Sequence, residues 1–236
     1  MSLLTKKVGV IAAQIEEIEP LIKQLDVREN SDTMFPTWEA KYHNQELLIQ
    51  VVGIGKVNSS IAVQRMIHLY EVGSIYMIGI AGGLKEGLGI GDVVIGKNLI
   101  QSDFDTSVFG YDIGQIPKID CRFFSSQDYF EYITAVKEKF AFNVVQGNYV
   151  TQDKFLTCSK TAEKLQTSFQ AFAVDMEAAA VGQTCYLNKI PFTIIKSISD
   201  KAGEKSTNEY KLHVNTSIIN SILVLKDLFD FQERII

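Results

Sequence analysis

Acidic residues follow several apolar segments of the chain, where carboxylates could serve as general acids, general bases or acceptors for a polar ligand. The stretch AFAVDMEAAAVG, residues 171–182, places Asp175 and Glu177 on either side of Met176. The apolar residues before Asp175 predict a short buried strand, and the alanines after Glu177 predict a helix. Two carboxylates at such a junction are unusual unless a basic side chain or a ligand binds to them. Other acids in comparable positions are Glu16, Glu17, Asp103, Asp105, Asp153 and Asp200.

Each of these features also has a purely structural explanation. Glu16 and Glu17 in a first helical turn would complement the helix dipole, and Asp200 could cap the next segment. The glycines of 53–56 and 79–83 could cradle a phosphate or simply form turns; neither matches a Walker loop or the full dinucleotide fingerprint. Three further side chains are ordinarily core residues: Phe155, Met176 and Tyr210.

Apolar runs rich in Val and Ile alternate with helical patterns along the chain. Such strands are buried on both faces, as in a mixed or mainly parallel sheet covered by helices. We therefore predict one α/β domain over residues 1–236, in three layers, α/β/α. Ligands in such folds bind at the carboxyl ends of strands, so the acids should converge on one crevice. The expected strands are 7–13, a hairpin over 37–54, 74–84, 91–105, 143–153, 171–174 and 190–200; the expected helices are 16–25, 57–70, 127–139, 160–168, one beginning near 176, and 207–229, with a loop over 106–124.

The composition excludes several classes of function. Lys and Arg total 23 against 28 Asp and Glu, a net charge of −5 with no basic block, so we expect no nucleic acid and no membrane as partner. No apolar stretch approaches the roughly 20 residues that cross a bilayer. Cys121, Cys158 and Cys185 show neither pairing nor zinc spacing, with each other or with the three histidines. We expect a cytoplasmic protein with reduced thiols, no metal and no cofactor.

Six segments, in order along nearly the whole chain, carry a family resemblance: VGVIAAQIEEIEPL, VVGIGKVNSSIA, IGIAGGLKEGLGIGDVVIG, DFDTSVFGYDIGQIP, VDMEAAAV and PFTIIKSISDKAGEKS. Together they resemble the 5′-methylthioadenosine/S-adenosylhomocysteine nucleosidases of the nucleoside phosphorylase superfamily. The resemblance implies a nucleoside phosphorylase-like fold with a central mixed, partly barrel-like sheet. It also implies hydrolysis of the bond between adenine N9 and ribose C1′, without a cofactor.

The resemblance gives Asp200 the role of general acid. Adenine is a poor leaving group as an anion, so Asp200 would protonate N7, with Ser199 holding its carboxyl group; burial would have to raise the pKa of Asp200. Glu17 corresponds to the base that activates water, with Glu16 facing solvent. Two carboxyl groups on opposite sides of a sugar, with room for water, follow the logic of inverting glycoside hydrolysis.

The same resemblance assigns the binding residues. Glu177 would accept hydrogen bonds from the ribose 2′- and 3′-hydroxyls, Met176 would lie along the ribose, and Asp175 would support them. Phe155 would stack on adenine, and the main chain of Leu156 would read its Watson–Crick edge. Residues expected in the rest of the site are Ala81 and Gly82 at the glycine turn, Ile54, Phe109 and Tyr210 around the 5′-alkylthio group, and Phe109 and Pro117 reaching the partner's site in a homodimer.

The chain departs from the usual family pattern at Gln14 and Ile15, which stand in place of a longer acid run, and at Ile80, Lys196 and Asp175. These changes leave the preference among 5′-substituents open, including 6-amino-6-deoxyfutalosine and 5′-deoxyadenosine. A nucleoside phosphorylase is a second alternative, but phosphate sites are normally built from arginines and backbone amides, and no arginine adjoins 79–83. A nucleoside-binding protein without catalysis is a third, and it would tolerate the loss of Glu17 or Asp200.

Overall fold

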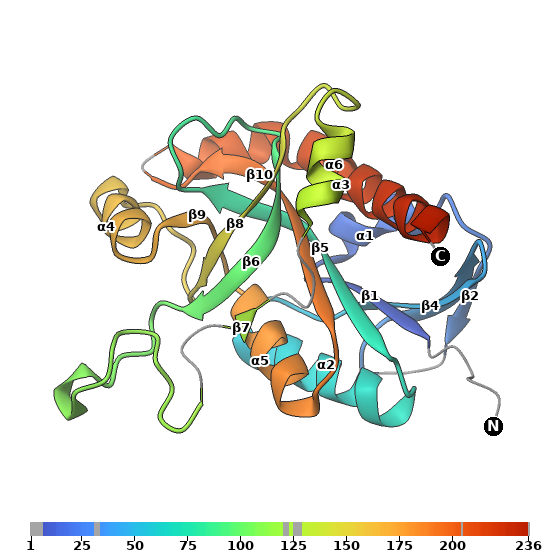
Figure 1. Ribbon diagram of the computed structural model, residues 1–236, viewed down its shortest axis with the longest axis horizontal. Coiled ribbons are helices and arrows are strands. Elements are labelled where there is room, and N and C mark those ends of the chain that lie inside the picture. Colours follow the sequence, from blue (N-terminus) through green and yellow to red (C-terminus); the bar gives the residue numbers. More distant parts are fainter. Residues whose placement is uncertain (1–6, 31–33, 120–122, 125–128, 204, 236) are drawn as a thin grey trace.

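A ten-stranded mixed sheet forms the centre of the structure, a computed structural model that describes residues 7–30, 34–119, 123–124, 129–203 and 205–235 (Figure 1). The strands run in the order β10-β6-β8-β9-β5-β1-β4-β3-β2, and β7 pairs with β6. Their bounds are β1 Val8–Ala12, β2 Val27–Asn30, β3 Thr37–Tyr42, β4 Gln45–Val51, β5 Ser74–Gly83, β6 Val93–Gln101, β7 Phe123–Phe124, β8 Val144–Thr151, β9 Ala171–Asp175 and β10 Phe192–Lys201.

One part of the sheet closes on itself, because β10 pairs with β5 as well as with β6. Strands β4, β1, β5 and β10 are parallel to their neighbours in that sequence, so their carboxyl ends share one edge. Strand β9 meets β5 in antiparallel fashion near the ends of both, with Val174 opposite Gly82. The carboxyl ends of β1, β5, β9 and β10 therefore lie together.

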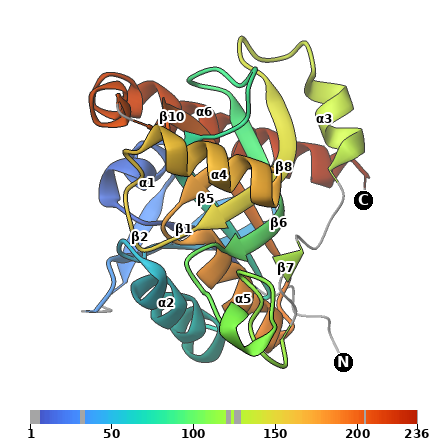
Figure 2. The ribbon, with the colours of Figure 1, turned by 90° about the vertical axis from the view of Figure 1, so that its left-hand side faces the viewer.

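Helices cover both faces of the sheet, which confirms the three-layer α/β/α architecture (Figure 1). Val10 of β1 packs in a core with residues of α1, α3 and α6, whereas the adjacent Ile11 packs with residues of α2 and α5. A smaller core includes residues of α4, β8 and β9. Helix α4 lies beside that end of the sheet (Figure 2). The helices are α1 Ile15–Ile22, α2 Lys56–Leu69, α3 Phe130–Val136, α4 Ser159–Phe169, α5 Ala178–Asn188 and α6 Ser206–Ile235, with a short 3₁₀ helix, η1, at Ser107–Phe109.

The structure differs from the sequence-based expectation in a few elements. Strand β2 was not expected, because VREN at 27–30 lacks an apolar alternation. It is the last strand of the sheet, and among the described strands it pairs with β3 alone. Strand β7 lies inside the expected loop over 106–124, and the strand expected over 91–105 ends at Gln101. The first residues of the helix expected over 127–139 and Cys121 lie outside the described residues. Cys185 is buried, and burial raises the pKa of its thiol.

No helix in the described part of the chain is both long enough and apolar enough to cross a membrane.

Candidate active site

A cavity of about 390 Å³ opens where the carboxyl ends of β1, β5, β9 and β10 meet. It is closed on one side by the first turns of α6 and on another by the turn before α2. Most of the residues expected from the sequence line it: Glu17, Ile54, Ala81, Gly82, Phe155, Asp175, Met176, Glu177, Ser199, Asp200 and Tyr210. The structure thus brings together segments as far apart in the sequence as those of Glu17 and Tyr210.

Three expected residues do not line this cavity. Leu156 lies in an adjoining pocket of about 40 Å³ that also contacts Phe155 and Asp200, and its carbonyl accepts a hydrogen bond from Ser206 Oγ at 3.1 Å. Phe109, in η1, is 78 % exposed. Pro117, like Phe109, is absent from the lining of the cavity within this single chain.

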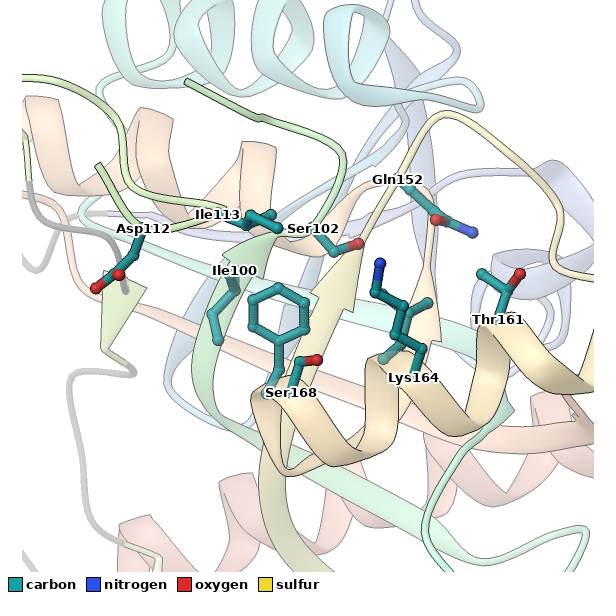
Figure 3. Close-up of a pocket in the computed structure, with 10 residues that line it drawn as sticks. Ile100, Ser102, Asp112, Ile113, Gln152, Thr161, Lys164 and Ser168 are labelled. Atoms are coloured by element: carbon teal, nitrogen blue, oxygen red, sulfur yellow. The ribbon is translucent and has the colours of Figure 1, made fainter. Parts of the chain in front are cut away.

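A second cavity, of about 630 Å³, lies between α4 and residues 100–113 (Figure 3). None of the expected site residues lines it. Its side chains include Ser102, Gln152 and Lys164, and it shares no lining residue with the first cavity.

Glu17 is held by backbone groups beneath the 390 Å³ cavity. The N–H of Gln14 donates to Glu17 Oε2 at 2.9 Å and the N–H of Ile80 donates to Oε1 at 3.1 Å. Gly79 makes room for the carboxylate, because a Cβ at this position would lie 2.4 Å from Oε1, and its φ of +142° also favours glycine. Glu17 is buried and Glu16 is exposed, so the register places Glu17 toward the cavity.

Burial raises the pKa of Glu17 from 4.5 to about 7; the nearby charge of Lys196 opposes this shift, and that of Glu177 adds to it. A carboxyl group with a pKa near 7 can exchange a proton with water at neutral pH.

Asp200 lies near the end of β10 and is also buried. Ser199 Oγ donates a hydrogen bond to Asp200 Oδ2 at 2.9 Å. Burial raises the pKa of Asp200 from 3.8 to about 6, against the lowering effect of the Ser199 hydrogen bond. The shift has the direction that a general acid requires.

Lys196 forms the charged centre of the site's floor. Its Nζ lies 2.7 Å from Asp175 Oδ2 and 2.9 Å from Glu177 Oε2, and the side chain is 1 % exposed. Burial by itself would lower the pKa of Lys196, but the charges of Asp175, Glu177 and Glu17 outweigh it and raise that pKa. The ammonium therefore neutralises carboxylates that would otherwise be costly to bury.

Asp175 and Glu177 use their oxygens differently. Asp175 Oδ1 accepts from Thr151 Oγ1 at 2.6 Å and Oδ2 from the Ala178 N–H at 2.9 Å, so this carboxylate fixes the start of α5. Glu177 Oε1 accepts from the Gly55 N–H at 3.1 Å. Each carboxylate oxygen has two lone-pair sites, so Glu177 keeps acceptor capacity for a ligand.

Aromatic and aliphatic side chains form the walls. The rings of Phe155 and Tyr210 meet edge to face, with centroids 6.0 Å apart. Phe155 is 43 % exposed and Ile54 is 47 % exposed, so apolar surface faces the open cavity. Such a site suits a ligand with a flat ring and an apolar substituent.

We expected acids from several strand ends to meet in one crevice, but Glu16 and three others lie outside it. Asp103, Asp105 and Asp153 do not line the cavity. Asp103 and Asp153 instead bind Lys56, and Asp105 accepts from the Ser107 N–H. A strand-end position fixes the edge of the sheet on which a side chain lies, but not the cavity that it faces.

The turn at 53–56 serves carboxylates instead of cradling phosphate. The N–H of Gly55 donates to Glu177 and the N–H of Lys56 donates to Asp153. No arginine of the described segments lines the cavity, and these segments contain no cluster of three His, Cys, Asp or Glu suited to a metal ion.

The cavity also contains residues that the sequence-based site omitted. Thr207 precedes Tyr210 by three residues and Lys211 by four on α6, so Thr207 shares a helix face with each of them. Helical spacing could have identified Thr207 from Tyr210, and Lys211 then from Thr207. The others are Ala13, Gln14, Ile80 and Val174, each adjacent in the sequence to an expected strand end or site residue.

Comparisons with known proteins agree with this geometry. The sequence model of the "Phosphorylase superfamily" matches residues 7–230. A 5′-methylthioadenosine/S-adenosylhomocysteine nucleosidase of Desulfotalea psychrophila is 33 % identical over 227 residues, which cover 95 % of this chain and 97 % of that protein.

Two solved structures are also similar. The nucleosidase of Neisseria meningitidis in complex with methylthio-immucillin-A has a TM-score of 0.89 and 34 % identity, covering 95 % of this chain and 98 % of that one. The futalosine hydrolase of Helicobacter pylori has a TM-score of 0.90 and 28 % identity, covering 97 % and 99 %. The fold, the cavity and these similarities together show that the chain belongs to the 5′-methylthioadenosine/S-adenosylhomocysteine nucleosidase family of the phosphorylase superfamily.

Proposed function

We propose that this chain, an N-glycosyl hydrolase by family, cleaves the bond between adenine N9 and ribose C1′ in 5′-methylthioadenosine and S-adenosylhomocysteine. The observation that carries the proposal is that two buried carboxyl groups with raised pKa values, Glu17 and Asp200, line one cavity. They come from different elements, α1 and β10, so both can act on a ligand between them.

Asp200 is the proposed general acid. As the N9–C1′ bond breaks, its electron pair moves to adenine, and Asp200 gives its proton to N7 so that adenine leaves neutral. The Ser199 hydroxyl, which donates to Oδ2, holds the carboxyl group in place. A raised pKa keeps more of Asp200 protonated near neutral pH than an ordinary aspartate.

Glu17 is the proposed general base. A water molecule attacks C1′ from the face opposite adenine and passes a proton to Glu17 as the new C–O bond forms. The two backbone hydrogen bonds from Gln14 and Ile80 keep the carboxylate fixed while it accepts this proton. The products are adenine and the 5′-substituted ribose.

Binding is assigned to the residues that surround this pair. Glu177 takes hydrogen bonds from the ribose 2′- and 3′-hydroxyls, and Met176 packs along the sugar. Phe155 stacks on adenine, whose edge is read by the main chain of Leu156. The 5′-alkylthio group is assigned to Ile54 and Tyr210; Ala81, Gly82 and Asp175 complete the floor.

The direct test is to incubate the protein with 5′-methylthioadenosine, with and without inorganic phosphate, and to measure adenine release. Hydrolysis predicts equal rates and free 5-methylthioribose in both cases. A rate that depends on phosphate, with a sugar 1-phosphate as product, would show a phosphorylase instead. Binding without any adenine release would favour a nucleoside-binding protein.

A second substrate is favoured by one observation, the similarity to the futalosine hydrolase of Helicobacter pylori. The same acid–base pair would cleave 6-amino-6-deoxyfutalosine, because its base is adenine and only the 5′-substituent differs. The ratio of kcat/KM for the two substrates, and for 5′-deoxyadenosine, measures which substituent the Ile54 and Tyr210 wall prefers.

A homodimer is also proposed, with Phe109 and Pro117 of each protomer completing the partner's 5′-substituent pocket. The exposure of Phe109 together with its neighbours Val108, Tyr111 and Ile113 supports it, because large exposed apolar patches mark interaction sites. Sedimentation of the protein, and a KM for 5′-methylthioadenosine that rises in Phe109→Ala, test the dimer and the contact.

A further inference from the structure

Three charged residues lie outside the cavity but contact one another: Lys56 at the end of the turn at 53–56, Asp103 after β6, and Asp153 after β8. Lys56 Nζ lies 2.7 Å from Asp103 Oδ1 and 3.9 Å from Asp153 Oδ2. The Lys56 N–H donates to Asp153 Oδ1 at 2.9 Å, and the Asp153 N–H donates to Asp103 Oδ2 at 3.0 Å. These contacts form a closed ring of three residues, here called the Lys56 ring.

The Lys56 ring is joined to the cavity through its neighbours in the sequence. Gly55, directly before Lys56, donates its N–H to Glu177 Oε1 at 3.1 Å. Ile54 and Phe155, which both line the cavity, are two residues away from Lys56 and Asp153 respectively. A shift of the ring would therefore move a wall residue on each side and the donor that holds Glu177.

The turn contains two glycines, the residue type with the least restricted backbone. Gly53 and Gly55 have φ values of +84° and +95°, which glycine adopts at no steric cost but which it also leaves easily. A Cβ at Gly55 would lie 3.3 Å from Asp153 Oδ1, so the turn passes close to the ring. The Lys56 side chain is only 19 % exposed, which limits the screening of its ion pair with Asp103.

Glu177 depends on this turn for one of its two oxygens. Its Oε2 is held by Lys196, and its Oε1 by the Gly55 N–H. If the turn loosens, Lys196 alone positions the carboxylate, and the carboxylate can rotate toward the floor of the site.

We propose that Lys56, Asp103 and Asp153 are positioning residues for Glu177: they fix the Gly53–Gly55 turn so that the Gly55 N–H holds the carboxylate that binds the sugar hydroxyls. This inference rests on the proposed function, because it takes Glu177 as the sugar-binding group. Asp103, Asp153 and Lys56 do not line the cavity, and the inference gives each of them a role.

The test is a double-mutant cycle with two readouts. Asp103→Asn keeps the size and one acceptor of Asp103 but removes its charge beside Lys56. We measure the Kd of methylthio-immucillin-A and the rate of adenine release from 5′-methylthioadenosine in wild type, Asp103→Asn, Glu177→Gln and the double variant. Asp105→Asn, an exposed acid in the same segment, is the matched control.

We expect Asp103→Asn to weaken binding about 5- to 10-fold and Asp105→Asn to change it less than 2-fold. In the Glu177→Gln background, the Asp103→Asn effect should fall below about 2-fold, because the group it positions is gone. Equal losses in both backgrounds, or no loss at all, would overturn the inference. A purely structural role predicts such additive losses together with an equal fall in melting temperature in both backgrounds.

The two proposals fail in different ways. If wild type binds the inhibitor but releases no adenine, the proposed function fails and the binding cycle still decides the inference. If Asp103→Asn does not fold, Lys56→Met enters the same cycle in its place.

Discussion

The burial of Glu17 makes a quantitative prediction about stability. Its pKa is 4.5 in an ordinary environment and about 7 in the folded protein, so the folded state binds the proton more tightly than the unfolded state. The free energy of unfolding must therefore fall as the pH rises above 4.5, and the fall ends above about pH 7. Between pH 5 and pH 8, these two pKa values give a loss of about 2–3 kcal/mol from this one residue.

Glu17→Gln removes this titration. The amide can accept only one of the two backbone hydrogen bonds, from Gln14 and Ile80, and leaves the other N–H facing its own NH₂ group. That defect costs about 1–3 kcal/mol, but it does not change with pH. The variant should therefore gain about 2–3 kcal/mol relative to wild type on going from pH 5 to pH 8.

Urea unfolding at pH 5, 6, 7 and 8 measures the difference directly. Glu16→Gln, on the exposed side of the same helical turn, is the control and should follow wild type at every pH. Asp200 and Lys196 remain in all three proteins, so their own titration cancels in the comparison. If the difference between Glu17→Gln and wild type is the same at pH 5 and pH 8, Glu17 does not have a raised pKa and the reasoning fails.

Three further predictions follow from the same site. The pH profile of kcat/KM should be bell-shaped, because one of the two carboxyl groups must be protonated and the other ionised. Its limbs should lie near pH 6 and pH 7 and belong to the Asp200 and Glu17 pair. A flat profile from pH 5 to 9 would contradict this prediction. Gly79→Ala should lose about 2 kcal/mol or more of stability in urea and most of its activity, because its Cβ would lie 2.4 Å from Glu17 Oε1. The control is Gly87→Ala, which should keep its activity because Gly87 also has a positive φ but no atom lies within 4 Å of the added Cβ. Lys196→Met should lower the free energy of unfolding by about 3–5 kcal/mol, because it leaves buried carboxylates unpaired. Lys196→Arg should recover part of this loss. Equal stability of the two variants would argue against the ion pairs.

The sequence predicted the acids that meet in the site because each follows a strand whose apolar run is unmistakable. The run before Asp175 and the run before Asp200 both mark parallel or closing strands, β9 and β10. The choice of Glu17 over Glu16 came from the register of the family resemblance, and in the structure Glu17 is buried and Glu16 is exposed. Apolar runs are local patterns. They are enough to predict a site residue whose position is set by the strand that the run itself forms.

Other parts of the site depend on contacts that no local pattern encodes. Asp103 and Asp153 look like catalytic acids from their positions, yet they bind Lys56, which is 47 and 97 residues away along the chain. Lys196 likewise becomes the partner of Asp175 and Glu177 only through the adjacency of β10 and the start of α5. Strand β2 was not predicted from the sequence, because a strand at the edge of a sheet does not need apolar residues on both of its faces.

We propose that Glu17 and Asp200 act together on one glycosidic bond, Glu17 as the general base and Asp200 as the general acid. The most direct measurement is kcat for adenine release from 5′-methylthioadenosine by Glu17→Gln and Asp200→Asn, with circular dichroism to confirm that each variant is folded. We predict that each substitution lowers kcat by ~10²-fold or more, the usual contribution of an acid or base in place. A folded variant of either residue that turns over at close to the wild-type rate would contradict the claim.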